Sequence, residues 1–399
     1  MLRGCHILIA FLLASALPAA AQTSFVPGDV LERARSLGAK GAAAYCPANP
    51  NYWRGSLGSL LSQRPPIQLK GLNSRMDNSE RIPASVAADR LADLTSSAAA
   101  HVMVTGNARV ADQLLDVFTF WAKSGAFTQT KSCTRGGRLL DSCTEWRRAD
   151  GKDLSDSKDF SKVQMTMAAA RSAYFASVAN HRREARAADH AAIRQWFAYF
   201  DGRHKTPSNI YLGLKTGWYW PAIEEAYSEG NARRAKSLTT KLVKGLDRLM
   251  LKDGSIKGRT TRGDRALWYH ATALGEIMTA MEMARAQGVK LPRNMEAKLH
   301  NAVLLYVRAL QNPANIDPWA KVALNSTYRP NYQDYRKDFW QNFFGHAWLH
   351  IYTYRYPETD AARWLAARIP RRSQSALFDS DTGLATGCIY NAARAARGG

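Results

Sequence analysis

The chain has 399 residues, of which 46% are hydrophobic and 22% are charged, and this balance excludes an intrinsically disordered protein. Its formal net charge of +22 favours a polyanionic partner, either a nucleic acid or an acidic polysaccharide. A proteome that is basic throughout is the alternative source of such a charge.

The N-terminus has the pattern of a secretory signal peptide over residues 1–21. Arg3 supplies the positive charge, the apolar run HILIAFLLASALP follows, and small residues at 19–21 provide a cleavage site before Gln22. The apolar run is too short to span a bilayer comfortably, and no later segment is long and apolar enough. We therefore expect a periplasmic or secreted monomer without stable membrane insertion. An exported protein meets acidic polysaccharide more readily than nucleic acid.

Residues 22–83 are rich in Pro, Gly, Asn, Ser and cationic side chains, which is typical of loops. A long loop in a compact domain is often a lid or a binding segment. Lys70, Asn73 and Arg75 in this segment are candidates for substrate contacts. The alternative is an N-terminal extension that wraps around the domain that follows.

Helical periodicity dominates from residue 84 onward, because apolar residues recur every three or four positions in segments bounded by Gly, Pro, Asn or Asp. We predict helices within residues 85–106, 108–127, 159–185, 189–204, 217–230, 231–254, 264–288, 292–313, 338–357 and 360–370. Alternating strand patterns are nearly absent. The sequence therefore predicts one all-α domain over residues 84–399, and a toroid of antiparallel helical hairpins is the best candidate.

Four cysteines remain once the signal peptide with Cys5 is removed, and an even number in an oxidising compartment suggests disulfides. Cys133 and Cys143 flank a short Gly-rich loop, so we pair them. This pairing leaves Cys46 with Cys388, as a clasp between the two ends of the chain. Free thiols are the alternative, and the spacing matches no zinc signature.

The stretch TTRGDRALWYHATAL at residues 260–274 places several polar side chains at the head of a predicted helix. If the helix starts near Asp264, then Arg262 and Tyr269 converge at one end of it. A nearby guanidinium favours the phenolate form of a tyrosine, whose phenol ordinarily ionises near pH about 10. Tyr269 is therefore a candidate proton-transfer residue with Arg262 as its charge partner. Arg265 and His270 are candidates for substrate contacts, with a structural role as the alternative for each.

One chemistry that needs such a pair is β-elimination of a 4-linked uronic acid polymer. A cation or an amide must hold the carboxylate while a base removes the C5 proton, and an acid must protonate the O4 leaving group. The segment DGSIKGRTTRGDRALWYHATAL resembles the family 5 alginate lyases, which carry Arg-Gly-x-Arg-Ala-Leu-x-Tyr-His. The stretches CPANPNYWRGSL, LLDVFTFWAKSGAF and SKVQMTMAAARSAYF are similar to that family more loosely. The resemblance implies an incomplete (α/α) toroid, secretion, lyase activity without a metal or organic cofactor, and Tyr269 as the proton-transfer residue.

The chain departs from that family at GLKTGWYWPA. The family has Asn-Asn-His-Ser-Tyr-Trp at the head of an earlier helix, and this chain has neither Asn nor His there. Lys215 is our candidate for supplying positive charge to the substrate carboxylate. Trp218 and Trp220 are candidates for stacking on a sugar ring, with core packing as the alternative. The lid tyrosine of the family is also absent, and Leu72 stands near its place.

The sequence thus predicts a polysaccharide lyase that cleaves alginate or a related uronan such as glucuronan. Two other functions stay open. One is a non-catalytic protein that binds acidic exopolysaccharide through a lyase-like fold, which the missing Asn-His pair favours. The other is a glycoside hydrolase on an (α/α) toroid, in which acids such as Asp201 and Asp264 pair across helices.

Overall fold

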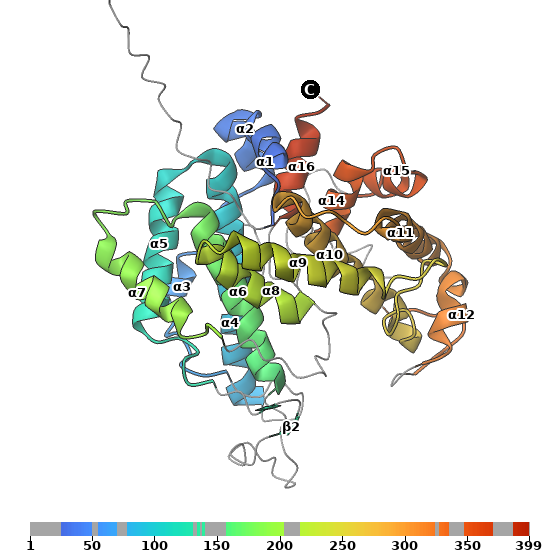
Figure 1. The fold of residues 1–399 in the computed structure, drawn as a ribbon, viewed down its shortest axis with the longest axis horizontal. Coiled ribbons are helices and arrows are strands. Elements are labelled where there is room, and N and C mark those ends of the chain that lie inside the picture. Colours follow the sequence, from blue (N-terminus) through green and yellow to red (C-terminus); the bar gives the residue numbers. More distant parts are fainter. Residues whose placement is uncertain are drawn as a thin grey trace, which may run out of the picture.

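The computed structural model describes residues 25–49, 55–69, 78–130, 134–135, 138–139, 157–202, 216–323, 327–334, 347–369 and 386–398. Nearly all regular structure in these ranges is helical (Figure 1). The strands within them form one antiparallel pair, β1 (Thr134–Arg135) with β2 (Arg138–Leu139). The predicted all-α fold class is confirmed.

The helices follow the chain in an order that keeps sequence neighbours close in space. They are α1 (Gly28–Arg35), α2 (Gly38–Tyr45), α3 (Ser59–Ser62), α4 (Asn78–Thr105), α5 (Ala108–Lys123), α6 (Ser157–Ser177), α7 (Ala187–Ala198), α8 (Thr216–Ser228), α9 (Ala232–Asp247), α10 (Ala266–Ala286), α11 (Met295–Gln311), α12 (Asp317–Ala320), α14 (Trp348–Arg355), α15 (Asp360–Ala366) and α16 (Gly387–Ala395). Two 3₁₀ turns, η2 (Gly263–Arg265) and η3 (Pro313–Ile316), directly precede α10 and α12.

Several helices begin where a polar residue caps the first turn, as the sequence predicts. The Asn107 side chain accepts hydrogen bonds from two amides of α5, the Asn231 side chain from one amide of α9, and the Thr359 hydroxyl from one amide of α15. Such caps satisfy amides that have no partner inside the helix. Each predicted helix corresponds to an observed one; the first part of the predicted helix 338–357 lies outside the described residues.

Three features differ from the sequence-based expectation. The segment expected to be loop-like contains α1 and α2, in which Val30, Leu31, Ala34 and Ala42 are buried. These helices have eight residues each, which is too short for a pattern of apolar residues to stand out. The long helix α4 begins at Asn78, before residue 84. The C-terminal α16 was not predicted at all.

The side chains form two large apolar clusters that divide the helices. One joins α3, α4, α5, α6 and α7, with Phe118, Trp121 and Tyr174 fully buried in it. The other joins α1, α2, α8, α9, α10, α11, α14, α15 and α16, together with one face of α4 and α6. Within the second cluster, α8 packs against α6, and α9 packs against both α8 and α10, so this pair of helices links α6 to α10 (Figure 1).

The two ends of the described chain are joined covalently. Cys46, directly after α2, forms a disulfide with Cys388 in α16. Helix α16 also packs against α1 and α2, so the bond fixes an existing contact between segments far apart in sequence. The predicted pairing of these two cysteines is confirmed. Cys133 and Cys143 lie outside the described residues, and their pairing stays a prediction.

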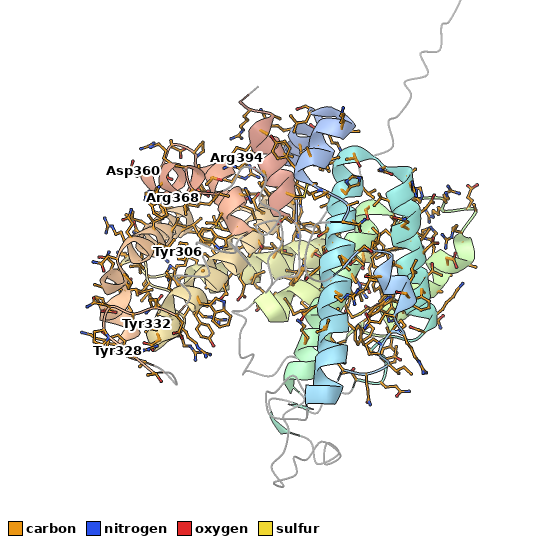
Figure 2. All side chains as sticks on the ribbon, turned by 180° about the vertical axis from the view of Figure 1, so that it is seen from behind. Tyr306, Tyr328, Tyr332, Asp360, Arg368 and Arg394 are labelled. Carbon is orange, nitrogen blue, oxygen red and sulfur yellow. A yellow bond between two sulfur atoms is a disulfide. The ribbon has the colours of Figure 1, made fainter. Side chains whose placement is uncertain are left out.

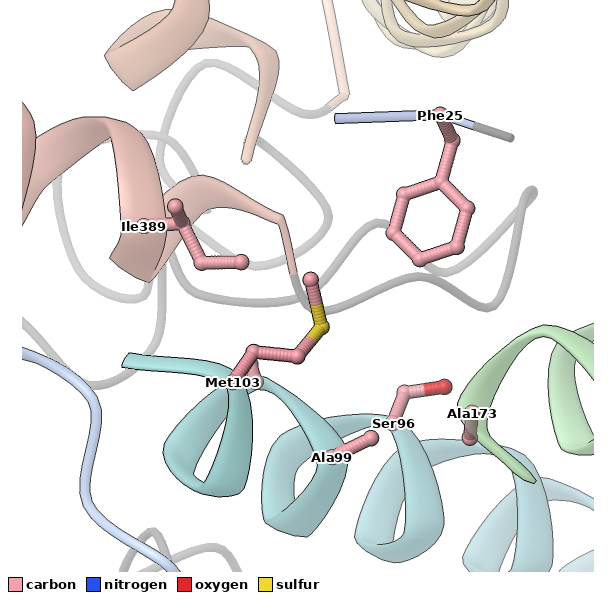
Figure 3. A pocket seen from close by; sticks show the side chains of 7 residues that line it. Phe25, Ser96, Ala99, Met103, Ala173 and Ile389 are labelled. Carbon is pink, nitrogen blue, oxygen red and sulfur yellow. The ribbon is translucent and has the colours of Figure 1, made fainter. Parts of the chain in front are cut away.

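A small apolar pocket marks the seam between the N-terminal segment and the helices below it (Figure 3). Phe25, Met103 and Ile389 approach it from the N-terminal segment, α4 and α16. Its empty volume is about 230 Å³, and its walls are mainly apolar. It is a packing seam that suits no polar or charged ligand.

The predicted signal peptide, residues 1–21, lies outside the described residues. In the helices that the structure does describe, none combines the length and the apolar character needed to cross a lipid bilayer.

Candidate active site

The motif at the head of α10 brings an aromatic ring and two arginines together. Tyr269 lies in the first turn of α10 and is 5% exposed. The guanidinium carbon of Arg262 lies 5.0 Å from the centre of the Tyr269 ring, and that of Arg259 lies 5.7 Å from it. The Trp268 ring lies 4.6 Å from the same ring, centre to centre. Both guanidinium groups thus lie within the range of a cation–π contact with the Tyr269 ring.

Arg259 is a member of this site that the sequence analysis missed. It is 4% exposed, and its Nη2 lies 3.6 Å from Oε1 of Glu276, which is 1% exposed. A buried guanidinium requires a counter-charge of this kind, because burying an unpaired ion is costly. Glu276 follows Tyr269 by seven residues, so both lie on one face of α10. The signal in the sequence was an acidic residue within an otherwise apolar stretch, two turns after the tyrosine.

Arg262 approaches Tyr269 from the loop that leads into η2. Its Nε donates a hydrogen bond of 3.0 Å to the carbonyl of Gly258, four residues earlier in the chain. This bond fixes the stem of the side chain and directs the guanidinium over the ring. The predicted proximity of Arg262 and Tyr269 is therefore found in the structure, with the arginine half-buried and not fully solvated.

His270 is fully buried behind Tyr269 and holds two segments together. Its Nδ1 lies 3.0 Å from the Thr260 hydroxyl oxygen. Its Nε2 donates a hydrogen bond of 2.9 Å to the carbonyl of Ala302 in α11. The ring also stacks on Tyr306 with an interplanar angle of 6°. Burial lowers the pKa of His270 to about 4, although the bond to Ala302 opposes this shift. His270 is therefore neutral and acts as a positioning residue for the loop that carries both arginines.

A second segment, residues 327–334, fixes the start of α10 from outside. The Asp264 carboxylate accepts bonds of 2.7 Å from both the backbone amide and Nε of Arg329. The Gln333 side chain accepts from the amide of Leu267 and donates to the carbonyl of Gly263. This glutamine thereby caps an amide that has no partner within the helix. Tyr328 and Tyr332 of the same segment lie beside α12 at one end of the molecule (Figure 2).

Arg265 lies away from the Tyr269 ring, and its predicted contact with substrate stays a prediction. The 3₁₀ turn η2 ends at Arg265, and α10 begins one residue later. Its side chain is exposed and lies 3.8 Å from the Asp334 carboxylate, whereas Tyr269 is buried between Arg259 and Arg262. The cation that accompanies Arg262 on the tyrosine ring is thus Arg259.

Comparison with known proteins bears on the fold and on the segment that contains this motif. Residues 218–316 match the family model described as alginate lyase, and this range contains α10 and the loop that precedes it. A tyrosine-to-phenylalanine variant of alginate lyase A1-III complexed with a tetrasaccharide aligns with a TM-score of 0.58 at 15% identity, over 93% of this chain and 96% of that chain. The chain has the alginate lyase fold.

Two further solved structures support that conclusion. Alginate lyase A1-III from Sphingomonas species A1 aligns with a TM-score of 0.53 at 16% identity, over 94% of this chain and 99% of that chain. An alginate lyase from Bacteroides ovatus aligns with a TM-score of 0.55 at 12% identity, over 93% and 99%. No curated protein sequence matches the chain. The predicted resemblance and the incomplete (α/α) toroid are both confirmed.

The lyase-like fold does not bring the two acids of the hydrolase alternative together as a pair. Asp264 binds Arg329, and Asp201 binds Arg171 of α6. Each carboxylate is thus bound by a different arginine, which suits a structural role more than acid catalysis. Within the described ranges, no three His, Cys, Asp or Glu side chains gather as possible metal ligands.

The remaining predicted site residues of the lyase-like chain divide into two groups. Trp220 is fully buried, and its indole donates to Glu224, so it belongs to the core. The position of the Trp218 side chain in α8 lies outside what the structure describes. Outside the described residues lie Lys70, Asn73, Arg75 and Lys215.

Proposed function

We propose that this protein is a polysaccharide lyase that cleaves a 4-linked polyuronate, alginate or a related uronan such as glucuronan, by β-elimination. The observation that carries the proposal is the Tyr269 ring with Arg259 and Arg262 against it, at the head of a helix in an alginate lyase fold. The family match over residues 218–316 supports the same reaction class.

Tyr269 transfers the protons in this proposal. As phenolate it removes the C5 proton of the uronate, the C4–O4 bond breaks, and the C4–C5 double bond forms. As phenol it then protonates the departing O4 on the same side of the ring. Arg259 and Arg262 favour the phenolate form that the first step needs, and their charge costs no reorganisation because both side chains are already held in place.

The substrate carboxylate needs its own positive charge while negative charge develops at C5. We assign this role to Lys215, with Lys70, Asn73 and Arg75 as further contacts to the polymer. An alignment on Trp218 places Leu214 and Lys215 opposite the Asn-His pair of the alginate lyase family, whereas an alignment on Trp220 places Thr216 and Gly217 there. Our proposal adopts the first alignment, in which Lys215 supplies the positive charge. The formal net charge of +22 supports a polyanionic substrate, and the signal-like N-terminus supports a periplasmic or secreted location where such polymers occur.

The double bond formed by β-elimination is conjugated to the carboxylate and absorbs ultraviolet light, which gives a direct assay. Mannuronan, guluronan, glucuronan and hyaluronan would each be incubated with the mature protein. We expect absorbance to rise with at least one uronan, and the variant Tyr269→Phe to give no rise while its melting temperature stays unchanged. Tyr354→Phe is the matched control, because Tyr354 is a buried tyrosine of α14 outside this site.

A binding protein without catalysis is the second candidate, favoured by the absence of Asn and His at residues 214–217. It predicts salt-sensitive retention on a uronan with no ultraviolet product from any of the four polymers. Full activity of Tyr269→Phe would overturn the proposed mechanism.

A further inference from the structure

A second pocket lies on the outer face of α11, apart from the Tyr269 ring. It is a shallow pocket with an empty volume of about 600 Å³, part of which is open to solvent. One wall is the hairpin 249–257, a second is α11, and a third is the turn that leads into α12. The polar and aromatic side chains that line it are Lys252, Asp253, Asn301, Arg308, Asn315 and Trp319.

The hairpin is held firmly against α11. Met250 and Ile256 pair as an antiparallel bridge at its base. At its tip, Gly254 has φ +87°, and a Cβ placed there would lie 2.5 Å from the carbonyl oxygen of Asn301. Only glycine permits this approach of backbone to helix. The Asn301 side-chain amide also donates a hydrogen bond of 2.8 Å to the carbonyl of Lys252, which fixes the backbone of Lys252 at the pocket edge.

The one carboxylate that lines the pocket, that of Asp253, already accepts hydrogen bonds from neighbouring residues. Asp253 accepts hydrogen bonds from the amide and hydroxyl of Ser255 and from the indole nitrogen of Trp319, at 2.9, 2.7 and 3.1 Å. Burial acts to raise the pKa of Asp253, but these bonds hold it below its ordinary value. The carboxylate therefore stays charged and serves to orient the Trp319 ring at the pocket wall.

The two cations of the pocket have no such partner. Lys252 and Arg308 are both exposed, and neither side chain forms an ion pair or a hydrogen bond with any part of the chain that the structure describes. The Asn315 amide donates to the carbonyl of Arg308, which ties the turn before α12 to this point of α11. The pocket therefore presents two cations that form no ion pair within the described residues, beside a fixed, partly exposed indole, and it carries a net positive charge together with Asp253.

We propose that this pocket is an accessory site that binds a uronate unit of the polymer, with Trp319 against the sugar ring and with Lys252 and Arg308 on the carboxylate. An aromatic face with neighbouring cations suits an anionic sugar, because the ring covers the apolar face and the cations neutralise the charge. The proposal rests on the proposed polyuronate function. The hairpin continues directly into residues 258–262, which carry the two arginines that lie against Tyr269.

Binding is tested with the double variant Lys252→Gln/Arg308→Gln. Its matched control, Arg233→Gln/Lys241→Gln, removes the same charge from exposed positions of α9. All variants carry Tyr269→Phe to prevent cleavage, and retention is measured by affinity electrophoresis in gels that contain the uronan cleaved best, or each of the four uronans if none is cleaved. We expect retention to weaken about fivefold for the pocket variant and to match the parent for the control.

A kinetic arm uses the same substitutions with Tyr269 intact. The pocket variant should raise KM for the polymer and leave kcat unchanged, and both constants should stay the same for a uronan trisaccharide. Trp319→Ala should weaken retention as well. If that variant fails to fold, the pocket double variant alone decides.

Equal retention of the pocket variant and its control would overturn the inference, whether both match the parent or both weaken. If the wild type forms the double bond but the pocket variant and its control are retained equally, the lyase proposal stands and only the accessory site is excluded. Selective loss of retention in the pocket variant, with no double bond formed from any uronan, would support the site and overturn the lyase proposal.

Discussion

The guanidinium carbon of Arg262 lies 5.0 Å from the centre of the Tyr269 ring, across the junction between a loop and the first turn of α10. The contact spans seven residues of sequence and a change from 3₁₀ to α-helical geometry at Ala266. It pairs the proposed proton-transfer group with a cation that is held by its own backbone contact to Gly258.

Arg262→Gln should lower kcat/KM about 100-fold, because a fixed charge that stabilises a developing anion contributes on that scale. Arg262→Lys should recover part of the loss. Loss of the cation disfavours the phenolate, so the rising limb of the pH profile of kcat/KM should move to higher pH. Arg233→Gln is the control for charge alone, and an unmoved pH profile in Arg262→Gln would contradict the assigned role.

Substitutions in the buried ion pair of Arg259 and Glu276 should affect stability and catalysis differently. Glu276→Leu leaves Arg259 buried without its counter-charge and should lower the free energy of unfolding by about 3 kcal/mol. Arg259→Met combined with Glu276→Leu should regain most of that stability, since no unpaired ion remains. Activity should stay low in the double variant, because Arg259 no longer lies against Tyr269. Urea unfolding and the ultraviolet assay measure the two effects, and restored activity in the double variant would exclude Arg259 from the site.

How far the sequence predicted this molecule depends on the range of each interaction. Periodicity located the first residues of α5 and α9 to within one position, because capping and amphipathic spacing are local. The contact of Arg262 with Tyr269 was predictable for the same reason.

The contacts that hold the start of α10 in place were not predictable, because they come from residues far away in the sequence. Gln333 reaches Leu267 and Gly263 across 66 and 70 positions, and Arg329 reaches Asp264 across 65. A single sequence holds no signal for such pairs. The burial of Trp220 likewise depends on packing between helices, and so the ring predicted to be a sugar contact belongs to the core.

The disulfide between Cys46 and Cys388 closes a loop of sequence separation 342. Cys46→Ser combined with Cys388→Ser should lower the free energy of unfolding by about 3 kcal/mol, because the unfolded chain gains freedom that the bond removes. The first elements to loosen should be α1, α2 and α16, which pack around the bond. Chemical denaturation measures the energy, and hydrogen exchange locates the loosened elements. Unchanged exchange in α16 would show that packing alone holds it.

Two fully buried histidines, His270 and His350, should make the protein sensitive to acid. Burial lowers the pKa of His270 to about 4, and burial together with the charge of Arg394 lowers that of His350 to about 3. In the unfolded chain both titrate near pH about 6.5. As pH falls below that value the unfolded state takes up protons first, so stability present above pH about 6.5 is lost on the way down to pH about 4, by about 3 kcal/mol for each histidine.

Substitution by leucine separates the two histidines at neutral pH. His270 bonds to Thr260 and Ala302, so His270→Leu should cost about 2 kcal/mol at pH 7 by leaving buried polar groups unmatched. Neither ring nitrogen of His350 has a hydrogen-bond partner within the described residues, so His350→Leu should raise stability at pH 7 by about 1 kcal/mol. Both variants should lose stability less steeply between pH about 6.5 and 4, because each removes one site of proton uptake by the unfolded chain. Urea midpoints across that range measure both effects, and an equal loss of stability in the two variants at pH 7 would show that the His350 ring is bonded after all.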